Sequence, residues 1–432
     1  MPQLYGSDSI RQWTVIAGPR PKSENFINET WRERSIEGMF RLLHPAYIRS
    51  DTTLIEIVKR IEEKSELCLD CEFQSEGRFF PKLCLLQLAY GDEFWAIDPH
   101  RVNLRLLAPI LKSKTINKVL HDGRQDLPIL ARAVGVDHIE QVFDTQIAAA
   151  FIGYGGSVGY GAIVQDICGV KLDKSLQMSD WSRELSDAQL EYALDDVRYL
   201  STVARNLRKR LMDNDRLDWV LAACEEAVQR ALRRPDPEKL YRRVASISRL
   251  NPGQLGILRE IAKWRNHVAE SIDKPVPSIG NDLALKSMAL HPPKDLRALE
   301  SVRGLGVGRN QPWAQQLFSA IAVGASRPEE NLRVIFSSEI ESKLDGIVSL
   351  LRMARHFVAI RDGIAPDLLA DSGDLRALAE AQVFAKPIDS NLSVLMSWRH
   401  EVLGQLLLKV LSGVVAFRID ASEPSGIAVT YN

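Results

Sequence analysis

The chain has 432 residues, of which 45% are hydrophobic and 26% charged, and its formal net charge is −1. This length leaves room for two or three domains, and the composition is that of a soluble globular protein. No apolar run approaches the roughly 18 residues of a membrane span, and the N-terminus has no signal-peptide core. We therefore expect neither a membrane protein nor an exported one.

The net charge conceals a difference between two parts of the chain. Residues 46–205 contain 18 Lys and Arg against 24 Asp and Glu, whereas residues 206–324 contain 20 against 13. An acidic part is expected where several carboxylates hold metal ions, and a basic part is a candidate surface for a polyanion. A basic excess spread over so many residues is equally typical of a solvated surface.

The cysteines favour a reducing compartment, the cytoplasm, because there are five of them, thinly spread. Cys68 and Cys71 form a CxxC pair, which can indicate redox or zinc chemistry. In a strand, however, residues i and i+3 project to opposite faces, and no second CxxC is present to complete a zinc site. We therefore expect neither function from this pair.

Residues 1–45 contain few apolar repeats, and we interpret them as an N-terminal extension. Beyond them, strand-like and helix-like segments alternate to about residue 205, which predicts an α/β domain. We expect its strands at 66–73, 82–90, 93–97, 116–121 and near 141–143. Short links join the first three, so these should form antiparallel hairpins at one edge of a mixed sheet.

The first of these strands carries two carboxylates. Because residues i and i+2 of a strand point to the same side, Asp70 and Glu72 share a face. Two carboxylates so close resist burial unless a cation lies between them, and their oxygens suit Mg²⁺ or Mn²⁺. A strand end that exposes both side chains to solvent would also explain the pair.

A second acidic position follows the strand at 116–121. The chain turns at Gly123 and enters a helical pattern, with Asp126 in its first turns. The ends of strands in α/β folds are where functional sites gather. A carboxylate that complements the helix dipole is the alternative interpretation.

The third motif lies in a helix. Ser186 and Gln189 fit a capping box, so the helix should begin there. Tyr192 and Asp196 are four residues apart and share a helical face, whereas Asp195 points elsewhere. An ordinary surface Asp pair beside a tyrosine at the core edge is the simpler reading of this motif alone.

The rest of the chain is predicted to be mainly helical. One long stretch covers 198–232 and ends at the proline-containing segment 233–239. Further helices are expected at 251–270, 281–290, 294–301 and 311–323, and again within 335–412. The tail, 413–432, is short and partly β-like.

Taken together, the three motifs resemble those of the DEDD exonuclease superfamily in its tyrosine-bearing branch. That branch has DxE in its first motif, a later Asp in its second and YxxxD in its third. The matching residues here are Asp70, Glu72, Asp126, Tyr192 and Asp196. Cys71 stands where the ribonuclease D members of this superfamily usually have threonine, but it points to the strand face opposite Asp70 and Glu72.

The closer resemblance is to the ribonuclease D family. It is carried by the segments FPKLCLLQLAY (80–90), AIDP (96–99), KVLHDGRQDL (118–127), FDTQIAAAF (143–151), LDKSLQMSDW (172–181) and EYALDDVRYL (191–200). Farther on, the Trp264-Arg265 pair and the segment PPKDLRAL resemble the helicase-and-ribonuclease-D C-terminal (HRDC) domain, of which a degenerate second copy follows.

The resemblance implies an α/β ribonuclease-H-like exonuclease domain, with a mixed sheet flanked by helices, followed by two all-α helical-bundle domains. The boundaries that we expect are 1–45 for the N-terminal extension, 46–210 for the exonuclease domain, 211–245 for a helical linker, 246–328 for the first HRDC domain, 329–412 for the second, HRDC-like domain and 413–432 for the tail.

The chemistry that the resemblance implies is hydrolysis supported by two divalent metal ions, Mg²⁺ or Mn²⁺. Asp70, Glu72, Asp126 and Asp196 would be the metal ligands, and Tyr192 would orient the attacking water. A tyrosine with a pKa near 10 is a poor general base at neutral pH, so an orienting role is the more physical assignment.

Three further residues are candidates for substrate binding. Phe73 could stack on a terminal base, although such an aromatic is more often part of the core. Lys174 could contact a phosphate, but an exposed lysine is common. His121, at a strand end, could contact substrate or be a structural histidine.

The sequence thus predicts a metal-dependent 3′→5′ exoribonuclease that releases nucleoside 5′-monophosphates. The resemblance implies structured RNA with a single-stranded 3′ end as partner, such as precursor tRNA, and we expect a cytoplasmic monomer without a membrane partner. A DNA 3′→5′ exonuclease is the first alternative, because the motifs do not distinguish the sugar. A non-catalytic nucleic-acid-binding scaffold is the second.

Overall fold

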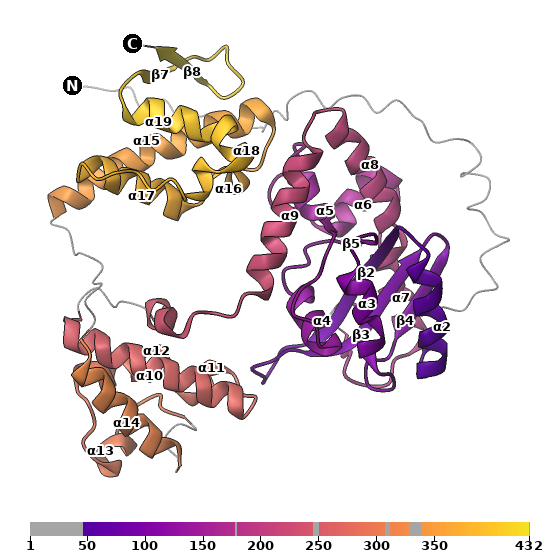
Figure 1. The fold of residues 1–432 in the computed structure, drawn as a ribbon, viewed down its shortest axis with the longest axis horizontal. Helices are drawn as coiled ribbons and strands as arrows, with labels where there is room; N and C mark the ends of the chain where they lie inside the picture. Colours follow the sequence, from indigo (N-terminus) through magenta and orange to yellow (C-terminus); the bar gives the residue numbers. More distant parts are fainter. Residues whose placement is uncertain (1–45, 178, 245–249, 307–311, 329–337, 432) are drawn as a thin grey trace, which may run out of the picture.

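The computed structural model describes residues 46–177, 179–244, 250–306, 312–328 and 338–431. The extension expected at 1–45 lies outside these residues. Figure 1 shows an α/β part from which the long helix α9 (Leu217–Leu232) leads toward the first of two helical parts. In this view both helical parts lie on the same side of the α/β part. In the described part of the chain, no helix combines the length and the apolar character needed to cross a membrane.

The α/β part is built on a six-stranded mixed sheet with the order β1-β4-β3-β2-β5-β6. Its strands are β1 (Ala46–Ile48), β2 (Glu66–Gln74), β3 (Lys82–Tyr90), β4 (Glu93–Ile97), β5 (Asn117–Leu120) and β6 (Val142–Asp144). Strands β2, β3 and β4 pair antiparallel, as expected from their short links, whereas β5 and β6 are parallel to β2. Strand β1 was not predicted from the sequence; it has three residues, pairs parallel with β4 and forms the outer edge.

Helices cover both faces of this sheet. One face lies under α2 (Asp51–Glu62), η1 (Leu104–Leu107), α3 (Ala108–Lys112) and α4 (Asp126–Val134). The other face lies under α5 (Thr145–Ala150), α6 (Tyr160–Cys168), α7 (Asp187–Arg198), α8 (Leu200–Met212) and α9 (Leu217–Leu232). Alternate residues of β2 point to opposite faces: Leu67 and Leu69 pack in the core on the α2 and α4 side, and Cys68 packs in the core on the α7 and α8 side.

The prediction of a single helix over 198–232 is wrong. The chain instead forms α8 and α9, separated by a turn in which Asp215 has a φ of 54°. Aspartate tolerates this left-handed conformation better than most residues, and the Arg216 amide donates to the Leu211 carbonyl at 2.8 Å to close the turn. The break lets α9 run back along the edge of the sheet that β6 forms.

The first helical part agrees with the helices expected there. It contains η2 (Pro237–Arg243), α10 (Pro252–Ser271), α11 (Val276–Ile279), α12 (Asp282–Leu290), α13 (Leu296–Glu300) and α14 (Trp313–Ser326). Helices α10 and α14 approach closely at Gly256 and Gly324. A Cβ at Gly324 would lie 2.4 Å from the Cα of Ile257, so only glycine fits there.

The second helical part ends in a β-hairpin. Its helices are α15 (Ser338–Asp362), α16 (Pro366–Leu369), α17 (Ser372–Val383), η5 (Ser393–Leu395), α18 (Ser397–Arg399), the π-helical turn η6 (His400–Gly404) and α19 (Gln405–Leu411). Strands β7 (Val415–Ile419) and β8 (Ile427–Tyr431) pair antiparallel and account for the β-like character of the tail.

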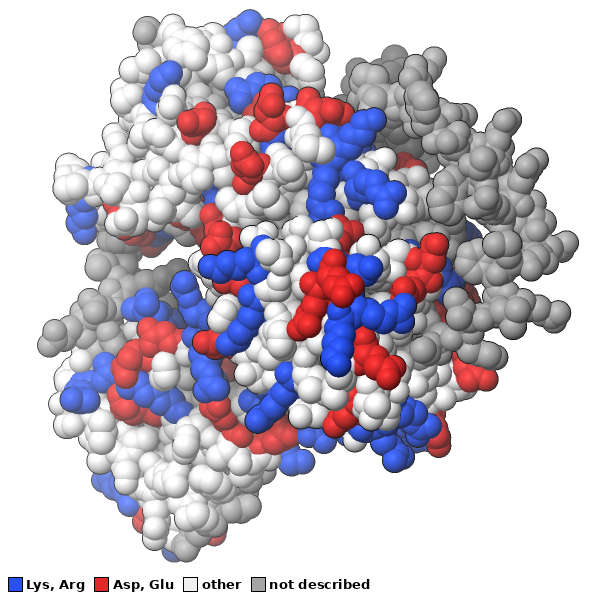
Figure 2. Space-filling view, turned by 45° about the vertical axis from the view of Figure 1, so that its right-hand side comes forward, with Lys and Arg blue, Asp and Glu red and all other residues white. Residues whose placement is uncertain are grey.

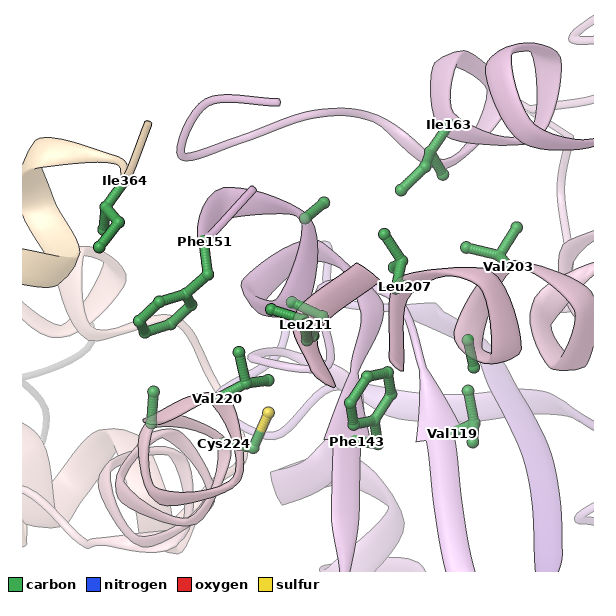
Figure 3. Packing of buried hydrophobic residues seen from close by; sticks show 14 of the residues in the cluster. Val119, Phe143, Phe151, Ile163, Val203, Leu207, Leu211, Val220, Cys224 and Ile364 are labelled. Carbon is green, nitrogen blue, oxygen red and sulfur yellow. The ribbon is translucent and has the colours of Figure 1, made fainter. Parts of the chain in front are cut away.

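The second helical part shares a hydrophobic core with the α/β part. Figure 3 shows Ile364 and Phe151 within this common cluster, which also contains Leu211 and Val220. The rings of Phe151 and Trp398 are 5.0 Å apart, and Ala365 N donates to Ala150 O at 2.8 Å. These two parts are therefore packed together as one body.

The first helical part is held differently, through the loop between β2 and β3. The carboxylate of Asp273, just after α10, accepts hydrogen bonds from Phe79 N at 3.1 Å and Phe80 N at 3.0 Å, and from Arg78 Nη1 at 2.7 Å. The Phe79 ring packs against the core of this helical part. The loop that follows the DxE strand is thus fastened to the first helical part.

Candidate active site

The first motif lies in the middle of the sheet. Asp70 and Glu72 are on β2, on the face covered by α7, and both are half-buried. Cys71 belongs to the core on the opposite face, as expected. The alternation of the strand therefore directs the two carboxylates together toward α7.

The third motif comes from α7. Ser186 forms the expected capping box with Gln189, which fixes where the helix begins and therefore which side chains face the sheet. Asp196 faces β2, and carboxylate oxygens of Asp70, Glu72 and Asp196 lie within 4.8 Å of one another. Asp195 points away and accepts a hydrogen bond from Arg198 Nη1 at 2.5 Å.

The second motif stands beside this cluster. Asp126 is the first residue of α4 and is buried, outside the three-carboxylate group but close enough for its charge to act on Asp70 and Glu72. The preceding turn is held by Asp144, whose carboxylate accepts from Asp122 N at 3.1 Å and from Gly123 N at 2.9 Å.

Asp144 is a structural contributor that the sequence analysis did not single out. It also caps α5, because its Oδ1 accepts from Gln146 N at 2.8 Å and from Ile147 N. Its position in the segment FDTQIAAAF, directly before a helical run, is an N-cap signal that would have identified it.

Burial is the main cause of the unusual proton affinities in the cluster. Loss of hydration, with repulsion from Asp196 and Asp126, raises the pKa of Glu72 to about 8. Loss of hydration, followed by repulsion from neighbouring acids, raises the pKa of Asp126 and of Asp196 to about 7 each, and that of Asp70 well above its usual range. The site therefore holds protons at neutral pH unless cations replace them.

These donors fit a hard divalent cation. Three carboxylates with oxygens within 4.8 Å of one another supply the anionic ligands that Mg²⁺ and Mn²⁺ prefer. A cation would also relieve the repulsion that raises the carboxyl pKa values.

Tyr192 lies one helical turn before Asp196 on α7, half-buried, with its ring 6.2 Å from that of Trp181. Partial burial and then the charge of Asp196 raise the pKa of its hydroxyl to about 12. The hydroxyl therefore keeps its proton at neutral pH and can donate or accept a hydrogen bond, but cannot act as an ionised base.

The structure does not bring all the expected substrate-binding residues to the cluster. Phe73 packs against the core on the opposite face of the sheet, because the period of two turns it away from Glu72. Both ring nitrogens of His121 have protein partners, Thr145 Oγ1 and Val158 O, each at 2.9 Å, which favours the structural interpretation. Lys174 is exposed in the loop between α6 and α7.

Two family models match the chain. The model described as a 3′-5′ exonuclease matches residues 45–212, which contain all the residues of the three motifs. The HRDC domain model matches residues 254–321, within the first helical part.

Known proteins match over nearly the whole chain. The ribonuclease D of Gluconacetobacter diazotrophicus is 33% identical over 385 residues, covering 88% of this chain and 96% of its own length. That of Zymomonas mobilis is 33% identical over 392 residues, covering 88% and 97%.

A solved structure extends the similarity to the fold. Escherichia coli RNase D, described as an exoribonuclease involved in structured RNA processing, superposes with a TM-score of 0.75 at 27% identity and covers 86% of this chain and 99% of its own. The carboxylate cluster, the exonuclease and HRDC matches and the near-complete coverage of these relatives agree: the chain belongs to the ribonuclease D family of 3′→5′ exoribonucleases.

Proposed function

We propose that the chain shortens RNA from its 3′ end by hydrolysis supported by two divalent ions, Mg²⁺ or Mn²⁺, and releases nucleoside 5′-monophosphates. The observation that carries this proposal is the convergence of Asp70, Glu72 and Asp196 from two separate elements to within 4.8 Å. A purely structural role does not account for it, because three like charges at such distances destabilise the fold.

The four carboxylates would be the ligands of two ions. Asp70, Glu72 and Asp196 would hold one ion, and Asp70 would share the second with Asp126, as the family resemblance implies. When bound, two such ions activate the attacking water and stabilise the leaving 3′ oxygen. The protonated hydroxyl of Tyr192 orients that water by a hydrogen bond, a role that its pKa of about 12 supports.

The substrate that we propose is structured RNA with a single-stranded 3′ end, such as precursor tRNA. Support comes from the relatives, and from the excess of basic residues in 206–324. Figure 2 shows Lys and Arg intermixed with Asp and Glu on the face that it presents. Some of the Lys and Arg residues in 206–324 are paired with acids, as buried Arg265 is with Asp282 at 2.8 Å. RNA contact would therefore be spread over several Lys and Arg side chains of this region. Exposed Lys174, in the α/β part, is a further candidate.

Action on DNA is the alternative that the carboxylates do not exclude, because the ions that they would hold act on the phosphodiester and not on the sugar. A scaffold without catalysis fits poorly, since every acidic motif residue and Tyr192 are present. All five cysteines are free thiols, which supports a reducing compartment such as the cytoplasm, and we propose a monomer.

The test is a product analysis with matched substrates. The purified protein is incubated with Mg²⁺ or Mn²⁺ and 5′-labelled tRNA bearing a 3′ tail, beside single-stranded DNA of the tail's length. We expect stepwise loss of ribonucleotides from the 3′ end, release of 5′-monophosphates, and no reaction in EDTA. Faster cleavage of the DNA than of the RNA tail would refute the proposed substrate.

A further inference from the structure

Gln87 is a buried amide that the sheet does not use. It lies in the middle of β3 and is 0% exposed, and neither its side-chain nitrogen nor its oxygen has a hydrogen-bond partner within the described residues. A buried amide without partners is destabilising, so an apolar residue of similar size would serve the core better. The position therefore calls for an explanation outside packing.

The register of the sheet places this amide beside the carboxylate cluster. Gln87 is directly opposite Asp70 on β2, and Leu85 is opposite Glu72. Directly opposite residues of antiparallel strands point to the same face with Cβ atoms about 5 Å apart. Leu85 and Ala89, the alternate residues of β3, belong to the core under α7, which confirms the face. The Gln87 side chain thus lies in the layer between Asp70 and the helix that supplies Asp196.

We propose that Gln87 is a positioning residue for Asp70. Its amide NH₂ donates a hydrogen bond to the Asp70 carboxylate when that carboxylate turns to hold divalent ions, and so fixes the orientation needed to bridge them. This inference rests on the proposed two-ion site. Carboxylates that hold metals are generally oriented by such outer hydrogen bonds.

The chemistry of the side chain suits this task. A lysine at residue 87 would compete with the cations for Asp70, and a further carboxylate would add to the repulsion that already raises the carboxyl pKa values. A neutral amide supplies a donor without changing the charge of the site. Residue 87 also lies on a central strand, so the donor is rigidly placed.

The test compares Gln87→Met with Leu85→Met. Methionine keeps about the volume of either residue, and Leu85 lies on the same strand and face but is apolar, so Leu85→Met reports packing changes alone. Mn²⁺ binding is measured without RNA, from the electron paramagnetic resonance signal of free Mn²⁺. The thermal unfolding temperature is measured in EDTA.

We expect Gln87→Met to bind Mn²⁺ about tenfold more weakly than the wild type, while its unfolding temperature in EDTA is equal or higher. Leu85→Met should bind Mn²⁺ within about twofold of the wild type. Weaker Mn²⁺ binding without a lower unfolding temperature would show that Gln87 positions Asp70. A purely structural role of Gln87 would lower the unfolding temperature instead.

Two results would overturn the proposal: unchanged Mn²⁺ affinity in Gln87→Met, or an equal loss in Leu85→Met. Gln87→Leu replaces Gln87→Met if the latter does not fold, and the same outcomes decide. Asp70→Asn separates this proposal from the underlying one. If wild type and Asp70→Asn bind Mn²⁺ alike, the two-ion site itself is wrong; if they differ and Gln87→Met matches the wild type, only the role of Gln87 is wrong.

Discussion

The substitution Asp196→Asn, with Asp195→Asn as its matched control, tests the third motif. The two residues are adjacent on α7 but face different surroundings. Asp196 meets Asp70 and Glu72, whereas Asp195 pairs with Arg198. Asp196→Asn should therefore lose activity and gain stability without metal, whereas Asp195→Asn should keep most activity and lose some stability.

The stability change follows from the geometry of the cluster. Two unit charges 4.8 Å apart repel by about 3.5 kcal/mol at an effective dielectric constant of about 20. At pH 8 without metal, Asp196, with a pKa of about 7, is mostly ionised, and Glu72, with a pKa of about 8, is half ionised. Asp196→Asn should therefore raise the free energy of unfolding by about 2 kcal/mol, roughly half of that repulsion.

Catalytic activity should fall in Asp196→Asn and be largely kept in Asp195→Asn. Loss of an outer partner of a metal ligand costs about 10–100-fold, so loss of the ligand Asp196 should cost at least about 100-fold in kcat. Asp195→Asn removes an ion pair whose side chains are 26% and 29% exposed, so it should cost about 1 kcal/mol of stability and leave activity within a few-fold.

The assay combines cleavage of 5′-labelled tailed RNA with urea unfolding at pH 8 in EDTA and in Mg²⁺. Mg²⁺ should stabilise the wild type and Asp195→Asn but not Asp196→Asn. If Asp195→Asn abolishes activity and Asp196→Asn does not, the assignment of the helical face is wrong. If Asp196→Asn is less stable than the wild type in EDTA, the like-charge reasoning is wrong.

Three other outcomes are expected. Asp70→Asn should abolish hydrolysis with the fold intact by circular dichroism, because an amide cannot supply the bridging charge; more than about a tenth of wild-type activity would contradict the two-ion assignment. The raised pKa values of Glu72 and Asp126 mean that the folded state keeps protons that the unfolded state has already lost. The metal-free protein should therefore lose stability as pH rises from about 4, where these carboxyls ionise in the unfolded chain, to about 8, where they have ionised in the folded one. Calorimetry should show tighter Mg²⁺ binding over the upper part of this range, and a pH-independent Mg²⁺ affinity would refute this. Asp273→Ala should release the loop at 78–80, so limited proteolysis should cut sooner between the α/β part and the first helical part. The affinity for tailed RNA should fall while cleavage of a dinucleotide is retained. An unchanged proteolysis pattern would show that the contact is dispensable.

Local periodicity explains why much of the sheet and site could be predicted. The long strands β2 and β3 are apolar runs between turn signals, and the i, i+2 and i, i+4 rules place Asp70 with Glu72 and Tyr192 with Asp196. Strand β1 has only three residues, too few to show a period, and exists because β4 offers it an edge. The family resemblance, not spacing, indicated that the three motifs converge.

Side-chain environments set by tertiary packing were beyond local rules. Phe73 is an exception, because the period of two already turns it away from Glu72 and toward the opposite core. The sequence gives no sign that His121 is held by Thr145 and Val158, because these contacts join parts of the fold that are distant in the chain. The left-handed Asp215 that separates α8 from α9 interrupts a pattern free of Gly and Pro, which is why the helix appeared continuous.

The shared core changes how RNA binding by the helical region should be tested. The sequence indicated that residues 206–324 are a candidate surface for a polyanion. In the structure, Trp398 stacks on Trp219 of α9 at 5.5 Å, and Arg399 pairs with Glu226 at 2.9 Å. A chain cut after α9 would expose this apolar surface and leave Glu226 unpaired, so lost RNA affinity would be confounded with lost stability. Single substitutions of surface Lys and Arg residues in the intact chain leave that core in place. A shallower dependence of RNA affinity on salt in such a variant isolates the electrostatic contribution of the residue.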